Sequence, residues 1–477
     1  MKKLYNKKLD MELSPLGFGV MRLAKNQDGT FPAEVHKLLA AAYERGINYF
    51  DTAYPYLGGS SERLIRDALV DRYPRESFLI ADKLPVWECR SRDDMERIFN
   101  VQLERLGVEY IDFYLLHALH KARWFEMRDI GALSFLDDKL KEGSVRKVGF
   151  SFHDTADVLT LILDAYDWDF AQLQINYYDW IAQHAKNCYE ELEKRGIPCI
   201  VMEPVGGGRL AKLPDRAEMI LKRARPWDSI ASWAVRFAVG LPNVAVTLSG
   251  MSDMEQLMDN YAALNSNPSL TEEEQSVLSN VVEILLDFNT IPCTNCGYCT
   301  EDCPKIIDIP QILKKYNDNS LFENTMRFDV YYNHAFPKSR QASNCIHCGK
   351  CVLKCPQNID IPKELEFIHN YAIELTIGVN IPKLKERLSY AAGLVCFGAG
   401  AKGRQALQIL QESGCEASYF CDNSESLWGT AVEGVEVISP DQLQKLCREQ
   451  DMCVLITSIY KKEIRKQLDE MGIEVFC

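Results

Sequence analysis

Two runs of cysteine have the most specific spacing in the sequence. The first consists of Cys293, Cys296, Cys299 and Cys303, followed by Pro304, and the second of Cys345, Cys348, Cys351 and Cys355, followed by Pro356. Both obey C-x2-C-x2-C-x3-C-P, a pattern that ligates 4Fe-4S clusters. Three closely spaced thiolates of such a run bind one cluster, and the fourth binds the other. The spacing therefore predicts two clusters.

The crossed arrangement predicts which cysteines share a cluster. We expect one set to be Cys293, Cys296, Cys299 and Cys355, and the other to be Cys345, Cys348, Cys351 and Cys303. Zinc is the competing metal because four thiolates also bind it tetrahedrally. A duplicated run of three cysteines plus one, ending in proline, is far more typical of iron-sulfur proteins. Residues 309–340, between the runs, read as helical, so this region resembles an α-helical ferredoxin.

A second group of reactive residues follows predicted strands in the first half of the chain. Asp51 lies at the end of the second strand, and Tyr56 lies in the loop just beyond it. Lys83 lies near the end of the third strand, and His117 ends the fourth. In an α/β barrel the loops that follow the strands form the active site. A lone residue of this kind is usually structural, whereas four at one end of a barrel indicate a site.

The charges of these residues suggest proton transfer. A Lys ammonium close to a Tyr hydroxyl favours the phenolate, so Tyr56 could exchange a proton near neutral pH. Asp51 would pair with Lys83 and hold it charged. His117 would hydrogen-bond a substrate oxygen and orient it. This set suits protonation of a carbonyl oxygen while a hydride arrives at the carbonyl carbon.

The elements that must position these residues are eight apolar runs with helical patterns between them. The runs lie near residues 16–20, 48–53, 78–84, 111–117, 147–152, 171–176, 198–204 and 245–250. Helices are expected over residues 32–45 and 93–106, with Gly46 and Gly107 as their C-terminal stops. Apolar strands that alternate with helices predict a parallel sheet covered on both faces. Eight repeats within about 250 residues favour a (β/α)8 TIM barrel, with an open doubly wound sheet as the alternative.

The 477 residues are predicted to form three domains. The barrel is expected over residues 1–288, a ferredoxin-like dicluster domain over residues 289–385, and a small Rossmann-like α/β domain over residues 390–477. The first boundary falls where cysteines, prolines and short helices replace the strand pattern. The second falls where a βαβ pattern begins near Gly393.

Several motifs of the first domain resemble the aldo-keto reductase family. They are GFGVMRL at residues 17–23, NYFDTA at 48–53, GSSE at 59–62 and IDFYLLH at 111–117, and they occur in the family's order. The resemblance covers the region from about residue 10 to about residue 290. It implies a nicotinamide-dependent enzyme acting on a small carbonyl or alcohol substrate. The implied catalytic tetrad is Asp51, Tyr56, Lys83 and His117.

The same resemblance implies where NADP(H) or NAD(H) would bind. Ser151 and Gln174 would hold the nicotinamide carboxamide, and Gly206, Gly207, Gly208 and Leu210 would contact the diphosphate. Ser249, Gly250, Gln256 and Asn260 would surround the adenosine. Gly250 and Gln256 stand where the family usually has the Lys and Arg that bind a 2′-phosphate, and Phe152 replaces a common Asn. These departures weaken the basis for preferring NADP over NAD.

The last domain contains a glycine turn between a predicted strand and a predicted helix. Gly398, Gly400 and Gly403 follow G-x-G-x-x-G, a spacing that lets a phosphate approach a helix N-terminus in this context. Asp422 follows about twenty residues later, where a ribose-binding acid is expected. We therefore expect a second nucleotide here. The alternative is a Rossmann-like fold that uses the glycines only for tight packing.

Composition limits the partners and the location. Lys and Arg number 54 against 68 Asp and Glu, so the net charge of −14 disfavours nucleic acid and anionic membranes. No run approaches the roughly 18 apolar residues that span a bilayer. Residues 1–8 are not followed by the apolar run of a signal peptide. The expected location is the cytoplasm, where the 17 cysteines stay reduced.

The leading hypothesis is an oxidoreductase whose barrel transfers hydride between nicotinamide and a carbonyl or alcohol. Its clusters would exchange single electrons with a partner such as ferredoxin or flavodoxin. A hydride carries two electrons and each cluster passes one, so exchange between them needs a flavin or radical step, and flavin stays a candidate cofactor. The alternative is an electron-transfer subunit whose barrel is mainly a scaffold. In a third hypothesis the C-terminal domain is a nucleotide sensor.

Overall fold

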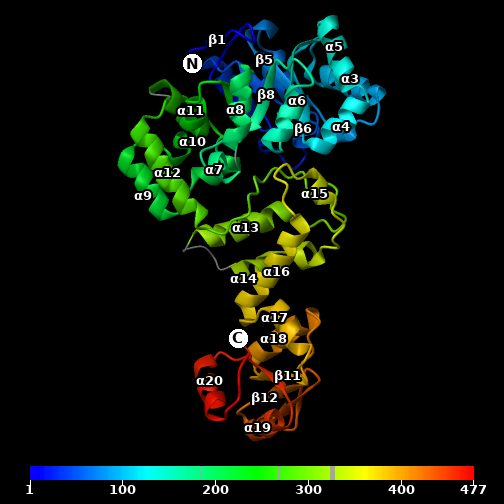
Figure 1. The fold of residues 1–477 in the computed structure, drawn as a ribbon, viewed down its shortest axis with the longest axis vertical. Coiled ribbons are helices and arrows are strands. Elements are labelled where there is room, and N and C mark those ends of the chain that lie inside the picture. Colours follow the sequence, from blue (N-terminus) through cyan, green and yellow to red (C-terminus); the bar gives the residue numbers. More distant parts are fainter. Residues whose placement is uncertain (184, 267–268, 323–327, 477) are drawn as a thin grey trace. The chain divides into compact units, whose positions relative to one another are not determined.

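Eight short apolar strands close into a parallel barrel in the computed structural model of this protein (Figure 1). They are β3 (Leu16–Gly19), β4 (Tyr49–Asp51), β5 (Leu79–Leu84), β6 (Ile111–Leu119), β7 (Val145–Phe152), β8 (Phe170–Gln174), β9 (Cys199–Met202) and β10 (Val244–Ser249). The first and last strands pair with Leu16 opposite Thr247, which closes the sheet. The predicted TIM barrel is confirmed, and the open doubly wound sheet is not formed.

The structure describes all residues except 184, 267–268, 323–327 and 477. They form two compact units, Met1–Cys296 and Gly297–Cys477. Within the described residues, no helix is long and apolar enough to cross a membrane.

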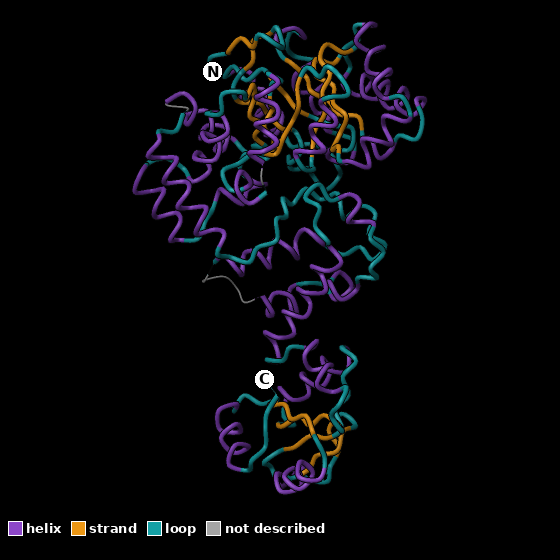
Figure 2. The backbone as a smooth tube through the Cα atoms, viewed as in Figure 1, coloured by secondary structure: helices purple, strands orange, loops and turns teal. Residues whose placement is uncertain are grey.

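Helices surround the barrel strands, as Figure 2 shows for the first unit. The larger ones are α1 (Ala33–Glu44), α3 (Arg92–Leu106), α5 (Ala132–Glu142), α6 (Ala156–Leu163), α8 (Ala185–Arg195), α9 (Asp215–Ala224), α10 (Ile230–Val239), α11 (Met254–Ser266) and α12 (Glu272–Leu286). The helix α4 (Lys121–Asp129) is of similar length, and α2 (Ser61–Ile65) and α7 (Asp179–Ala182) are shorter. Gly107 ends α3 in the left-handed conformation, as predicted.

The barrel interior is filled by large apolar side chains, so it is a packed core and not a channel. Tyr49, Phe113, Phe170, Ile200 and Val246 form its centre and are fully buried. A hairpin of β1 (Leu4–Asn6) and β2 (Met11–Leu13) contributes Leu9 and Leu13 to this core. The sequence analysis did not predict this hairpin because its three-residue strands show no hydrophobic alternation. With the interior packed, polar chemistry is restricted to the strand ends.

The second unit begins with a helical region that contains most of the predicted cysteine ligands. Its larger helices are α13 (Ile309–Leu321), α16 (Ile361–Ile377) and α17 (Ile381–Leu388), and α14 (Phe328–Val330) and α15 (Lys350–Lys354) are short. The helical prediction for residues 309–340 is met by α13 and α14, while residues 323–327 lie outside the described residues.

The second unit ends in a five-stranded mixed sheet in the order β13-β14-β12-β11-β15. The strands are β11 (Gly393–Phe397), β12 (Tyr419–Cys421), β13 (Ala431–Val432), β14 (Val435–Ile438) and β15 (Met452–Ile456). Its helices are α18 (Ala401–Glu412), α19 (Pro440–Glu449) and α20 (Lys461–Glu470). The predicted Rossmann-like α/β fold is confirmed, with one antiparallel pair, β13 and β14, at its edge.

Candidate active site and cluster-binding loops

A buried ion pair lies at the carboxyl ends of β4 and β5. Lys83 Nζ donates to Asp51 Oδ1 at 2.6 Å and to the carbonyl oxygen of Thr52 at 2.7 Å. The side chains of Lys83 and Asp51 are only 1% and 5% exposed. Burial raises the pKa of Asp51, and the Lys83 ammonium opposes this effect. The pair fixes the ammonium at the barrel mouth.

Tyr56 and His117 complete the predicted group of four. The Lys83 ammonium lies 4.8 Å from the centroid of the Tyr56 ring, and the rings of Tyr56 and His117 lie 5.8 Å apart. The Trp87 ring lies 5.0 Å from the ring of His117. Residues from three neighbouring strands and one loop therefore converge, as the strand-end positions predicted.

A backbone irregularity positions His117. Ala118 has a φ of +53°, and the pairing of β6 with β7 shifts register there. The Ser151 hydroxyl accepts a hydrogen bond from the Ala118 N–H at 2.7 Å. Burial, with a further contribution from the Lys83 charge, lowers the pKa of His117 well below its usual value. His117 is therefore a neutral imidazole at ordinary pH. Ser151, predicted to hold a carboxamide, supports the backbone beside it.

Gln174 belongs to a buried polar network that the sequence analysis did not predict. Gln174 Nε2 and Asn176 Nδ2 both donate to Asp179 Oδ2, at 2.7 and 2.6 Å. Arg209 Nη2 lies 3.8 Å from the other oxygen of Asp179. Asn176 and Asp179 belong to no recognisable motif, so only the fold reveals that they orient Gln174.

The predicted diphosphate loop follows β9. Gly206, Gly207 and Gly208 have φ values of +57°, +67° and +97°, a left-handed run that favours glycine, and Leu210 is buried behind them. A Cβ at Gly208 would meet no atom of the described residues within 4 Å. This open position fits the close approach of a diphosphate.

The predicted adenosine site lies after β10. Asn260 Nδ2 donates to Ser249 Oγ at 3.0 Å, and the Gln256 side chain bonds the backbone of Ser252 at 2.9 Å. Between Ser249 and Asn260 the sequence has three acids, Asp253, Glu255 and Asp259, and no Lys or Arg. Gly250 has no side chain that could contact a phosphate. This end of the site suits an uncharged ribose better than a 2′-phosphate.

Two buried acids lie behind Lys83. Glu62 and Asp82 are fully buried and share a hydrogen bond. Glu62 also accepts from Arg105 at 2.8 Å. Burial raises the pKa of Glu62 to about 7, although Arg105 opposes it, and burial together with Glu62 raises the pKa of Asp82. The sequence analysis missed this pair because its members lie on separate elements.

The two cysteine runs share a backbone conformation that the sequence analysis did not predict. Asn295 and His347, at equivalent positions, have φ values of +57° and +53°. The equivalent glycines Gly297 and Gly349 have +86° and +72°, and Ile306 and Asn358 have +51° and +53°. Three pairs of residues with positive φ at matched positions indicate that the two cysteine runs form two copies of one turn.

The second predicted ligand set lies around one cavity. Cys303, Cys345, Cys348 and Cys351 line it with Pro304 and Pro362. Four cysteines around one small cavity agree in residue type with a 4Fe-4S cluster, whose ligands are cysteine thiolates. Of the first predicted set, Cys293 and Cys296 belong to the first unit, and Cys299 and Cys355 belong to the second.

A cavity of about 520 Å³ opens where the C-terminal sheet reverses strand order. It is lined by Gly398, Gly400, Gly403 and Asp422 together with residues after β15. A Cβ at Gly403 would lie 1.8 Å from the carbonyl oxygen of Gly398, whereas one at Gly400 would meet nothing within 4 Å among the described residues. Asp422 accepts from the backbone of Ala399 at 2.8 Å and of Ser424 at 2.9 Å.

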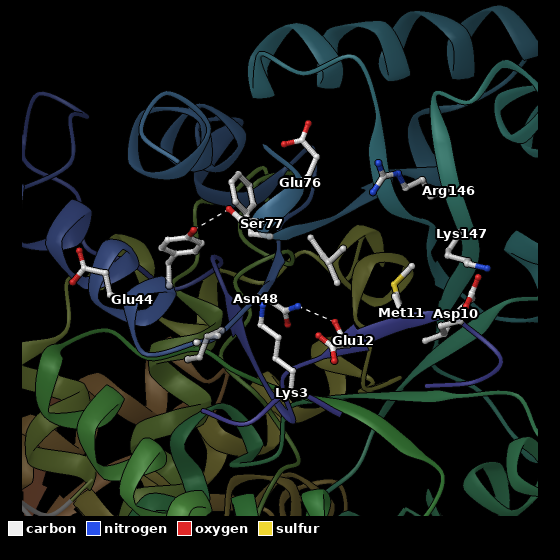
Figure 3. A pocket seen from close by; sticks show the side chains of 16 residues that line it. Lys3, Asp10, Met11, Glu12, Glu44, Asn48, Glu76, Ser77, Arg146 and Lys147 are labelled. Carbon is white, nitrogen blue, oxygen red and sulfur yellow. Dashed lines mark hydrogen bonds between the residues drawn. The ribbon is translucent and has the colours of Figure 1, made fainter. Parts of the chain in front are cut away.

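Figure 3 shows a larger hollow of about 790 Å³ at the amino ends of the barrel strands. Asn48 donates to the carbonyl oxygen of Glu12 at 2.9 Å, which ties β2 to the barrel. Lys3, Glu76, Arg146 and Lys147 surround this hollow. The four converging residues lie at the other ends of the strands, so we assign this hollow to the stabilising face of the barrel.

Comparison with known proteins agrees with this architecture. The family model described as "Aldo/keto reductase family" matches residues 15–283, more than half of the chain. The chain belongs to the aldo/keto reductase family and is an oxidoreductase of that family. Residues 292–359 match a 4Fe-4S dicluster domain, which implies two clusters, and residues 391–475 match a domain described as C2185-like, N-terminal.

Curated relatives cover the barrel. The chain is 26% identical over 302 residues to the uncharacterized oxidoreductase YqkF of Bacillus subtilis, covering 57% of this chain and 93% of that one. It is 25% identical to the NADH-specific methylglyoxal reductase of Escherichia coli, covering 60% and 99%. It is 31% identical over 216 residues to the 6-dehydroglucose reductase of Novosphingobium aromaticivorans, covering 42% and 67%.

A solved structure shares the barrel fold. It is an aldo-keto reductase of Bacillus halodurans in its holo form, with a TM-score of 0.51 and 24% identity. The match covers 59% of this chain and 96% of that chain.

Proposed function

We propose that the barrel reduces a small carbonyl compound, or oxidises the corresponding alcohol, with a nicotinamide cofactor that supplies or accepts the hydride. Tyr56 donates the proton to the carbonyl oxygen, and Lys83, held by Asp51, favours the charge that develops on the Tyr56 oxygen. His117 is neutral and orients the substrate oxygen by hydrogen bonding. Trp87, beside His117, forms an apolar side of the substrate site.

The observation that carries this proposal is the Lys83 ammonium, fixed by Asp51 and lying 4.8 Å from the Tyr56 ring centroid. Replacing Tyr56 with Phe removes the acid and keeps the ring, so we expect kcat for carbonyl reduction to fall by about 10²- to 10⁴-fold. Cofactor affinity, measured by fluorescence titration, should remain unchanged. Tyr54→Phe is the matched control, because the Tyr54 hydroxyl in the same loop faces Arg97. Equal activity of Tyr56→Phe and wild type would disprove the assignment.

We further propose that NADH is preferred over NADPH. Gly250 and Gln256 provide no cation for a 2′-phosphate, and the three neighbouring acids would repel it. The Escherichia coli relative, which is similar over nearly its whole length, is named as specific for NADH. Comparison of kcat/KM for the two cofactors tests this preference.

The clusters are proposed to pass single electrons between the protein and a ferredoxin or flavodoxin. Anaerobic titration of the reconstituted holoprotein with NADH, followed by the visible absorbance of the clusters, tests whether nicotinamide electrons reach them. Bleaching would require a mediator such as a flavin, because a hydride carries two electrons. Failure of both NADH and NADPH to bind would instead favour an electron-transfer subunit with a scaffold barrel.

The C-terminal cavity is proposed to bind a nucleotide or a related phosphate ester. Its support is the open position at Gly400 beside the N-terminus of α18, at the point where strand order reverses. Calorimetric titration of the full chain with ATP and with NAD+, compared with a Gly400→Val variant, tests this site. Equal binding by the variant would place the nucleotide elsewhere.

A further inference from the structure

Arg22 crosses the end of the barrel where β3, β10 and β9 finish side by side. Its Nη2 pairs with Glu203 Oε1 at 2.5 Å, and the two side chains are 25% and 18% exposed. Its Nη1 donates to the carbonyl oxygen of Thr294 at 2.8 Å. A second contact, to the carbonyl oxygen of Asn295, is longer at 3.5 Å. Arg22 therefore joins the barrel to the backbone between Cys293 and Cys296.

Glu203 is held rigidly in place to receive Arg22. It follows β9 directly and has a φ of +55°, a left-handed conformation that costs energy in a residue with a Cβ. The Glu203 carbonyl oxygen accepts from the Gly206 N–H at 2.9 Å and from Asn176 Nδ2 at 3.2 Å. The same backbone turn thus anchors Glu203 and begins the glycine loop.

The glycine loop contacts the same segment from the other side. A Cβ at Gly207 would lie 2.3 Å from the carbonyl oxygen of Thr294, closer than real atoms approach. Gly208, the next residue, has open space at the equivalent position. Gly207 is therefore needed for close packing of the Cys293–Cys296 segment, whereas Gly208 leaves room for a ligand. This distinction is invisible in the sequence, where the three glycines look equivalent.

We infer that Arg22 and Gly207 seat the first cysteine loop on the barrel mouth, so that the backbone of Thr294 forms one side of the predicted diphosphate site. The inference rests on the proposed function for the identity of that site. It makes Arg22 a positioning residue for the ligand loop. It also places Cys293 and Cys296, two predicted ligands of the first cluster, beside the barrel mouth within the first unit.

The positive charge of Arg22 predicts the direction in which it shifts the reduction potential of the first cluster. Burial lowers the pKa of Arg22, but the charge and hydrogen bond of Glu203, together with Cys296 and Tyr56, raise it above its ordinary value. The guanidinium stays charged in proteins. A cluster held by thiolates becomes more negative on reduction, and its potential depends on nearby charge and hydrogen bonding. Arg22 should therefore stabilise the reduced form of the first cluster.

The first experiment uses the full-length holoprotein with both clusters reconstituted. Potentiometric titration followed by electron paramagnetic resonance should show that Arg22→Met shifts one cluster to a more negative potential and leaves the other unchanged. The second cluster serves as an internal control. Arg22→Lys keeps the charge but loses the planar fork that reaches Glu203 and Thr294 from two separate nitrogens, so we expect an intermediate shift. Two unchanged clusters, or two clusters shifted equally, would overturn the inference.

The second experiment compares adjacent glycines. Gly207→Ala and Gly208→Ala impose similar backbone strain, since both positions have positive φ. Only Gly207→Ala should change the spectrum of the first cluster and speed its loss of iron to a chelator. Identical cluster behaviour of the two variants would show that the contact with Thr294 does not seat the loop.

ADP-ribose, which has the diphosphate but no nicotinamide, tests the shared side of the site without redox chemistry. Its binding, measured by calorimetry, should alter the signal of the first cluster in the wild type and less so in Arg22→Met. Tight binding with no spectral change would overturn the shared site while the proposed cofactor stands. Absence of binding would overturn both the shared site and the proposed cofactor. A cluster shift in Arg22→Met would then show only that Arg22 positions the first cysteine loop.

Discussion

At the residue scale, the candidate active site depends on the charge states of buried side chains. Lys83 donates to Asp51 and to the backbone of Thr52, and these hydrogen bonds hold its ammonium close to Tyr56. His117 lies within the same site but is neutral, because burial and the Lys83 charge both disfavour its protonation. A neutral imidazole can donate a hydrogen bond to a carbonyl oxygen without supplying the proton that we propose comes from Tyr56.

Cofactor choice is also decided by single residues. Gln256→Arg places a cation at the proposed 2′-phosphate position, so the KM for NADPH should fall about fivefold, as expected for roughly 1 kcal/mol from an exposed ion pair. The KM for NADH should change little, and the gain should shrink at high salt. Gln275→Arg adds the same charge at an exposed position of α12 and is the control. An equal gain from both variants would show a nonspecific charge effect.

At the element scale, β5 carries a basic side chain and an acidic side chain on neighbouring residues, which point to opposite sides of the strand. Lys83 points to the barrel mouth, whereas its neighbour Asp82 shares a hydrogen bond with Glu62 of α2. The Arg105 guanidinium of α3 pairs with the same glutamate. This network joins α2 and α3 to the strand that presents the Lys83 ammonium.

The raised pKa of Glu62 predicts a pH dependence of stability. The folded chain holds the Glu62 proton up to about pH 7, whereas the unfolded chain releases it near 4.5. Folding is therefore favoured at low pH, and this contribution to the free energy of unfolding falls as the pH rises between those values. Glu62→Gln keeps a neutral group, so its stability relative to wild type should increase with pH.

Urea denaturation at about pH 5 and about pH 8 measures this difference. Glu283→Gln, on the exposed side of α12, is the control and should show no such trend. A stability difference between Glu62→Gln and wild type that does not change with pH would contradict the raised pKa of Glu62.

At the scale of the whole molecule, the cluster-bearing helices and the C-terminal sheet share a core. Ile373 and Ile377 of α16 and Leu384 of α17 pack in the same buried cluster as Leu394 and Leu410. The predicted boundary between residues 385 and 390 therefore separates α17 from the sheet against which its buried side chains pack. The sequence pattern predicts three domains, whereas the described residues form two compact units.

This shared core predicts the result of truncation. A chain ending at residue 389 would expose Ile377 and Leu384 to water, so we expect a lower thermal unfolding temperature and incomplete cluster content. Leu410→Ala in the full chain is the milder test, and it should cost about 2–5 kcal/mol of stability. A truncated chain that keeps both clusters and unfolds like the wild type would show that the shared core is dispensable.

The sequence by itself determined the features that lie close together along the chain. The cysteine runs, the strand-end positions of Asp51, Lys83 and His117, and the glycine turn at Gly398 are legible because a few covalent bonds fix their spacing. The barrel followed from eight repeats of one pattern. The hairpin β1–β2 was missed because three-residue strands have too little periodicity to be recognised.

Only the tertiary structure decided which distant residues meet. Arg22 bonds Glu203 across 181 residues and Thr294 across 272, and no local pattern records such separations. The different tasks of Gly207 and Gly208 also appear only in three dimensions, because they depend on what lies beside each Cα. Spacing along the chain identifies candidate ligands and acids, because each motif is local. Closure of the barrel decides which of these residues lie close together.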